Sequence, residues 1–109
     1  MVFINYICIY SKNIGNKMNK KIAEKTVRVA QMSSMILDAQ LRELKDVLDE
    51  TEFKELSKRF AKPMGYIYYE ILAPIWDEYS ELLPDKLGGS YKINDEMYHE
   101  VQLLVKKYA

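Results

Sequence analysis

The sequence predicts an all-α fold, a small bundle of four to five helices with a long first helix. Three observations support this class: apolar residues recur at helical spacing over 20–48, capping signals precede two later segments, and prolines stand where helices begin or end. The chain has 109 residues, of which 49% are hydrophobic and 29% charged, as in an ordinary folded domain. We therefore expect residues 18–109 to form a single helical domain.

Residues 1–17 differ from the rest of the chain. Residues 1–10 are apolar apart from Asn5, and their composition is typical of a short strand or a tail. They lack the basic leader of a signal peptide and the length of a membrane-spanning helix, so we expect no membrane association. The residues that begin at Met18 (MNKK) are typical of a bacterial or phage-like protein start. A non-native N-terminal extension is therefore an alternative interpretation of residues 1–17.

The first helix is the clearest element. Neither proline nor glycine occurs over 20–48, and apolar or small residues recur there at alternating spacings of four and three. This seam consists of Ala23, Val27, Ala30, Ser34, Leu37, Leu41, Leu44 and Leu48. A flanking stripe of Ile22, Val29 and Ile36 widens the apolar face, as in a bundle core. A helix this long in a small chain favours a second copy, and we assign the dimer seam to Ala30, Leu37, Leu41 and Leu44.

Capping residues and prolines divide the middle of the chain. Asp49 with Glu52 fits a capping box, and Leu48 with Phe53 fits a hydrophobic staple, so a second helix is expected from Asp49 to about residue 61. A third helix is expected to begin at Pro63 and to reach about residue 72, because the residue before a proline avoids the helical region. Pro74 then kinks this helix or begins another that reaches about residue 82.

The last quarter of the chain contains the clearest loop and a final helix. Residues 84–92 (PDKLGGSYK) are rich in turn formers. Asn94 is expected to cap the last helix, with Ile93 and Tyr98 as its staple. The apolar face of that helix is expected to consist of Met97, Tyr98, Val101, Leu104, Val105 and Tyr108.

Charge balance limits the partners. The 16 basic and 16 acidic residues cancel, which disfavours wholesale coating of nucleic acid and removes electrostatic repulsion between copies. The basic residues gather near the N-terminus, where Lys17, Lys21, Lys25 and Arg28 follow one another at helical spacing. This stripe is the candidate nucleic-acid contact, but no aromatic residue interleaves with it and no helix-turn-helix pattern is visible. Nucleic-acid binding is therefore an alternative that we do not favour.

Residues suited to catalysis or metal binding are scarce. With Cys8 alone no intrachain disulfide can form, which fits a cytoplasmic protein. Glu96 and His99 have the spacing of ferritin-type metal ligands, but those sites need further ligands and the chain has one histidine. The acids Asp77, Glu78, Glu81 and Asp85 are more typical of a solvated helix end than of paired catalytic carboxylates. We expect no enzymatic activity, no catalytic residue, no cofactor and no metal. A helical bundle that binds a metal or a small ligand is a further alternative function.

The stretch 64–76 is apolar on nearly every side and contains three tyrosines in four residues. Its simplest interpretation is a central helix buried by its neighbours. Tyrosine and tryptophan are also enriched at protein interfaces, and one helix of a small bundle is seldom buried all round. We assign a partner-binding surface to Tyr66, Tyr69, Trp76 and Tyr79. The sequence thus predicts a small non-enzymatic interaction protein (an adaptor, inhibitor or accessory factor) that is expected to form a homodimer.

Overall fold

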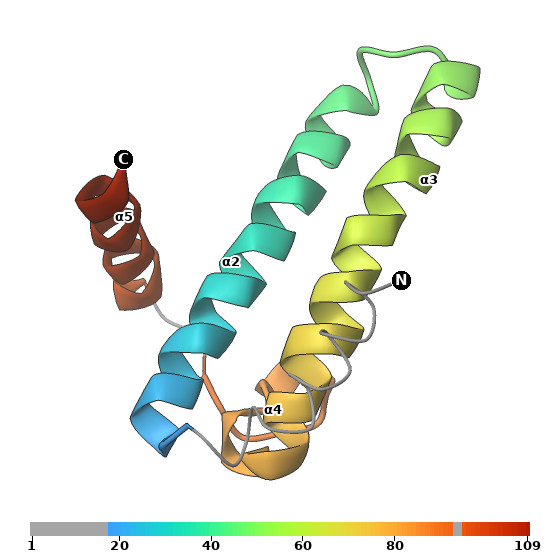
Figure 1. Cartoon of the computed structure of the whole chain (residues 1–109). Coiled ribbons are helices and arrows are strands. Elements are labelled where there is room, and N and C mark those ends of the chain that lie inside the picture. The colour runs from blue at the N-terminus through green and yellow to red at the C-terminus, as the bar shows by residue number, and fades with distance from the viewer. Residues whose placement is uncertain (1–17, 93–94) are drawn as a thin grey trace, which may run out of the picture.

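The structure is a computed structural model, and it describes residues 18–92 and 95–109. Within these residues the chain is helical and contains no β-strand: two long antiparallel helices stand side by side and a third crosses one of them (Figure 1). The predicted all-α class is confirmed. The predicted count is wrong for this part of the chain, because three helices replace the expected four to five. The strand or tail expected over residues 1–10 lies outside the described residues.

Helix α2 spans Lys20–Leu44. Asn19 caps its N-terminus, where its Oδ1 accepts a hydrogen bond of 2.9 Å from the backbone N–H of Ile22. The helix ends four residues before the predicted end at Leu48, and the chain turns over 45–49. In this turn the Leu48 N–H donates to the Leu44 carbonyl at 3.0 Å, which satisfies one of the acceptors that a helix end leaves open.

Helix α3 spans Glu50–Tyr66. The predicted cap is confirmed, because Asp49 Oδ1 accepts a hydrogen bond of 2.8 Å from the Glu52 N–H. The predicted break at Pro63 is wrong: this proline lies inside α3. Pro63 removes one backbone donor, but it lies on the exposed side of α3, where water can satisfy the acceptor it leaves.

The helix continues past Tyr66 without a break, through a π-helix over Ile67–Leu72 and then α4 over Ala73–Glu78. At their junction the Ala73 N–H donates to the carbonyl of Tyr68, five residues back. Such an inserted residue rotates everything after it by roughly 100° about the helix axis. Pro74 stands in the first turn of α4, where a missing N–H costs little.

The core lies where α2 meets this second half of the long helix. It is formed by Ala23, Val27, Ala30, Leu72, Ile75, Trp76 and Leu82. The small residues of α2 face the large residues of the π-helix and α4, so the two backbones can approach closely. The seam of α2 is therefore used within the chain at its N-terminal end.

A short loop connects this core to the last helix. It contains two 3₁₀ turns, Ser80–Leu82 and Asp85–Leu87, and an isolated bridge between Pro84 and Tyr91. Gly88 has a φ of 91°, and a Cβ on Gly89 would lie 2.0 Å from the Leu83 carbonyl oxygen, so the tight loop depends on both glycines.

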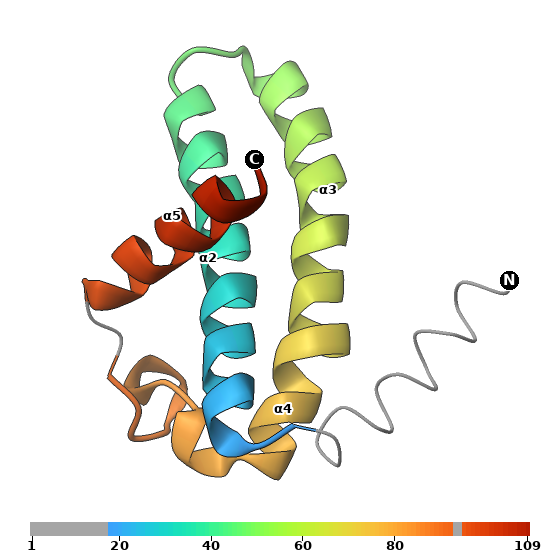
Figure 2. The same cartoon turned by 60° about the vertical axis from the view of Figure 1, so that its left-hand side comes forward.

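Helix α5 spans Glu96–Tyr108 and crosses α2 at an angle (Figure 2). Its N-cap residue is Asp95, which makes no side-chain capping bond. The predicted cap Asn94 and staple residue Ile93 lie outside the described residues.

Candidate interaction surface

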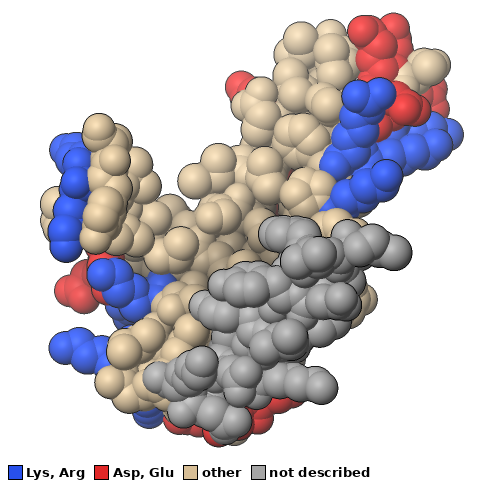
Figure 3. Space-filling view, viewed as in Figure 1, with Lys and Arg blue, Asp and Glu red and all other residues tan. Residues whose placement is uncertain are grey.

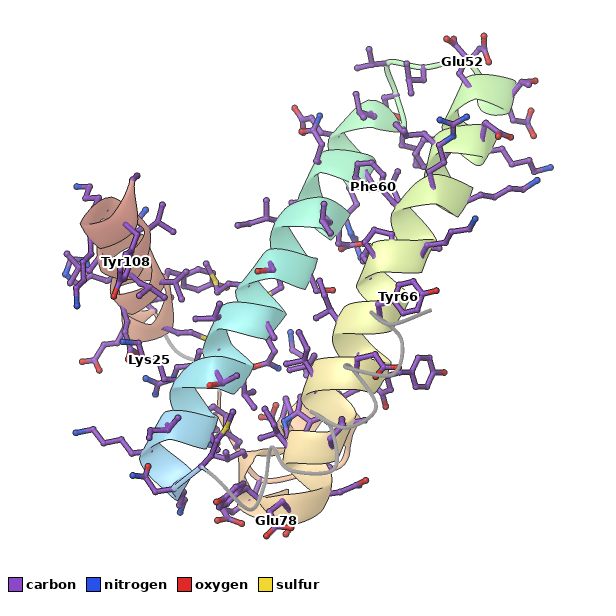
Figure 4. The ribbon with its side chains drawn as sticks, viewed as in Figure 1. Lys25, Glu52, Phe60, Tyr66, Glu78 and Tyr108 are labelled. Atoms are coloured by element: carbon purple, nitrogen blue, oxygen red, sulfur yellow. The ribbon has the colours of Figure 1, made fainter. Side chains whose placement is uncertain are left out.

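The predicted partner-binding residues fall into two groups. Tyr66 and Tyr69 are 67% and 71% exposed, and Figure 4 shows Tyr66 pointing away from α2. Trp76 is only 6% exposed and belongs to the core. Tyr79 is half-buried, and its hydroxyl donates a hydrogen bond to the Met18 carbonyl. The structure therefore leaves two of the four aromatic side chains on one exposed surface.

Tyr68 connects the two groups, although it was not among the predicted site residues. Its ring packs edge-on against Tyr69, with centroids 5.0 Å apart, and against Trp76 at 6.0 Å. The run of tyrosines marked this region, but the rotation introduced by the π-helix determines which ring bridges to the core. We call Tyr66, Tyr68 and Tyr69 the tyrosine patch.

The predicted dimer seam also divides. Ala30 is buried in the core, whereas Leu37, Leu41 and Leu44 are half-buried farther along the same face of α2. This face pairs with α3, and Figure 4 shows Phe60 between the two helices. We call residues 33–65 the arm. No side chain in the arm is fully buried.

The predicted basic stripe is partly engaged within the chain. Lys17 lies outside the described residues, and Lys21 and Lys25 are exposed on α2. Arg28, in contrast, contacts Glu24 at 3.5 Å, donates to the Tyr91 hydroxyl at 3.0 Å and pairs with Glu100 of α5. Arg28, one of the four residues predicted to contact nucleic acid, thus makes its contacts within the fold.

The contacts around Arg28 shift the pKa of both Arg28 and Tyr91. Burial alone lowers the pKa of Arg28, but the hydrogen bonds to Tyr91 and Glu100 outweigh it and raise that pKa above its ordinary value. Burial raises the pKa of Tyr91, although the nearby Arg28 opposes this shift. Both shifts keep the guanidinium charged and the phenol neutral at physiological pH.

The residues considered above as catalytic carboxylates or metal ligands lie at the surface. Asp77, Glu78, Glu81 and Asp85 are exposed, as are Glu96 and His99. Figure 4 shows Glu78 at the end of the molecule formed by α4. Over residues 18–92 and 95–109 no three histidine, cysteine, aspartate or glutamate side chains come together as a metal site. No helix in this part of the chain is long and apolar enough to cross a bilayer.

No protein-family model, no curated protein and no solved structure gives a significant match. Any function must therefore be argued from the residues themselves.

A further surface feature is apolar, and it includes Ile36, Val105 and Tyr108 of the apolar helix faces predicted from the sequence. Large apolar side chains are exposed on α2 and α5: Met35, Ile36, Leu103, Val105 and Tyr108. Between α5 and the arm Figure 3 shows a hollow whose surface is mostly uncharged, while the basic side chains of α5 lie along its outer edge. Large exposed apolar side chains on neighbouring helices are typical of sites of protein association.

Proposed function

We propose that this chain is a small non-enzymatic interaction module that acts by protein–protein binding and self-associates as a homodimer. The arm carries the proposal. Its residues include Leu37, Leu41, Leu44, Phe53, Leu56 and Phe60, yet none is fully buried. Helix α3 contains no buried residue at all.

An antiparallel pair of helices needs a further layer to bury its apolar face. Stable helical domains obtain that layer by packing additional helices around one core. In this chain Figure 2 shows α5 crossing α2 near the middle of α2, yet no described residue of the arm is fully buried. A second copy supplies further helices that can pack on the apolar face of the arm.

The charge of the chain supports self-association. Its 16 basic and 16 acidic residues cancel, so two copies meet without net repulsion. The exposed tyrosine patch offers a further surface for a protein partner, since tyrosine contributes large contact area at little entropic cost. A cytoplasmic location accompanies this proposal, because the chain has a single cysteine.

The two alternative functions, nucleic-acid binding and metal binding, have less support from the structure. For a nucleic-acid-binding regulator, Lys21 and Lys25 remain exposed, but Arg28 is paired with two carboxylates. Lys20 also lies 3.6 Å from Glu81. For a metal-binding bundle, no observation on the described residues favours the site. We therefore propose neither of them as a second function.

Light scattering on a sizing column tests the proposal, with absorbance at 260 and 280 nm recorded across the peak. We expect a mass near twice the 12.9 kDa of one chain and no nucleic acid in the peak. A monomer at every concentration would contradict self-association. A peak that carries nucleic acid, removable by salt, would instead favour the regulator.

A further inference from the structure

The apolar face of α5 leaves the molecule as the helix proceeds. Met97, Val101, Leu104 and Tyr108 follow one another at spacings of four, three and four, so they share one face of the helix. Met97 is 1% exposed, Val101 and Leu104 are half-buried, and Tyr108 is 77% exposed. The N-terminal end of α5 is thus anchored on α2, and its C-terminal half forms an apolar ridge whose exposure rises from the half-buried Leu104 to the largely exposed Tyr108.

The opposite wall of the hollow is a groove on the arm. The groove is lined by Ser34, Met35, Asp38, Ala39 and Arg42 of α2 and by Met64 of α3. Asp38 and Arg42 neutralise each other through a hydrogen bond of 2.8 Å, so the groove has no net charge. Methionine side chains adapt readily to a packed partner. The groove therefore suits an apolar helix.

The charges at the two ends of this surface are complementary. Lys106 and Lys107 occupy the last turn of α5. The groove runs along α2 towards the turn at 45–49. Residues 43–52 around this turn carry one basic residue, Lys45, and five acidic residues: Glu43, Asp46, Asp49, Glu50 and Glu52. A basic helix end that enters the groove is attracted towards this acidic end of the arm.

We propose that the C-terminal half of α5 in one copy packs into the hollow between α5 and the arm of a second copy, and that the second copy does the same in return. This inference rests on the proposed function, since it names the surface through which the homodimer forms. It places the interface on α5 and the arm rather than on the tyrosine patch, which stays available to another protein.

A second copy is the occupant because each chain carries both halves of the contact. A two-fold dimer requires one patch to be self-complementary, and an apolar ridge beside an apolar groove satisfies that requirement. Two-fold symmetry makes the contact twice and so doubles the area that one ridge and one groove would bury. The zero net charge of the chain lets the two copies approach.

Cross-linking between differently substituted copies tests the arrangement. One batch carries Cys8→Ser and Tyr108→Cys, and the other carries Cys8→Ser and Ala39→Cys. After the batches are mixed, a short bis-maleimide is expected to give a product that contains one copy of each. A third batch with Cys8→Ser and Leu87→Cys is the control, because Leu87 is an exposed loop residue away from the groove. It is expected to give little mixed product with Tyr108→Cys.

A second measurement uses charge. Val105 is 59% exposed on α5, so Val105→Lys can be tolerated by the single chain, but it buries an ammonium group in the proposed interface. We expect dimer dissociation to become about tenfold easier or more, with unchanged helix content. Leu87→Lys is the matched control and should leave the dimer intact.

The outcomes separate the inference from the proposed function. A dimer that gives the mixed cross-link and is weakened by Val105→Lys supports both. A dimer that gives no mixed cross-link and is indifferent to Val105→Lys overturns the inference while the proposed function stands. A wild-type chain that is monomeric at all concentrations overturns both.

Discussion

Arg28 and Glu100 join the first and last described helices. They lie 72 residues apart in the sequence, and Arg28 Nη1 of α2 donates a hydrogen bond to Glu100 Oε2 of α5. The same guanidinium donates from Nε to the Tyr91 hydroxyl, which fixes the end of the loop that precedes α5. One side chain on α2 therefore sets where α5 begins and, through it, the direction in which the apolar ridge leaves the molecule.

Replacing this side chain should release α5 without unfolding the rest. We expect Arg28→Ala to lower the free energy of unfolding by about 1 kcal/mol, which is less than a buried charged hydrogen bond contributes, because Glu100 is partly exposed to water. The amides of α5 should then exchange hydrogen faster than those of α3. Arg28→Lys keeps the charge but cannot reach all three partners, so it should give an intermediate effect. Unchanged protection of α5 in Arg28→Ala would contradict the assigned anchor.

Two glycines should respond in opposite directions to alanine. Gly65 lies inside α3, and a Cβ there meets nothing within 4 Å, so Gly65→Ala should stabilise the chain by about 0.5–1 kcal/mol. In Gly89→Ala the new Cβ collides with the Leu83 carbonyl, and the loop must shift at a cost of about 2 kcal/mol. Urea unfolding of both variants beside the wild type measures the difference. Equal midpoints for the two variants would contradict the loop geometry.

The cap of α3 should give a pH-dependent contribution to stability. The hydrogen bond from the Glu52 N–H lowers the pKa of Asp49 below its ordinary value of 3.8. Because the pKa is lower in the folded chain, the charged carboxylate stabilises the fold above the ordinary pKa, and this contribution disappears as the pH falls through the lowered value. Asp49→Asn keeps a capping oxygen but cannot titrate. The thermal midpoint of the wild type should therefore fall relative to that of Asp49→Asn between pH 5 and pH 2, within the acid range in which such carboxylates lose their charge. A constant difference between the two proteins over this range would exclude a titrating cap.

Much of the fold could be predicted from patterns among residues close in sequence. The side-chain oxygen of Asp49 accepts the Glu52 N–H as the capping pattern predicts, because capping depends on residues close in sequence. The glycine loop before α5 was predictable for the same reason. The small residues Ala23 and Ala30 also marked the part of α2 that a neighbouring segment approaches most closely.

Features set by tertiary contacts were not predictable. Pro63 breaks a helix by local preference, but here it occupies an exposed position in a helix that continues on both sides. The π-helix over Ile67–Leu72 changes the rotation of every later residue, so a regular helical period wrongly grouped Trp76 with Tyr69. The commitment of Arg28 to Glu100 depends on how α5 folds back, which no pattern within α2 reveals.

The division between Trp76 and the tyrosine patch gives a direct test of core against surface. Trp76 is buried with Ile75 and Leu72, so Trp76→Ala should leave a cavity and cost about 3–5 kcal/mol. Trp76→Phe should cost clearly less, because it refills part of the volume and Trp76 Nε1 has no hydrogen-bond partner among the described residues. Tyr69→Ala removes an exposed ring and should change stability by about 0.5 kcal/mol or less.

Thermal melts followed by circular dichroism rank the three variants, and light scattering reports their association. If the dimer forms through α5 and the arm, Tyr69→Ala should remain dimeric and fully helical, because the tyrosine patch lies outside that contact. Loss of the dimer in Tyr69→Ala with intact helix content would instead move the interface onto the patch. Equal destabilisation by Trp76→Ala and Tyr69→Ala would contradict this division between core and surface, because removing a buried side chain should cost more stability than removing an exposed one.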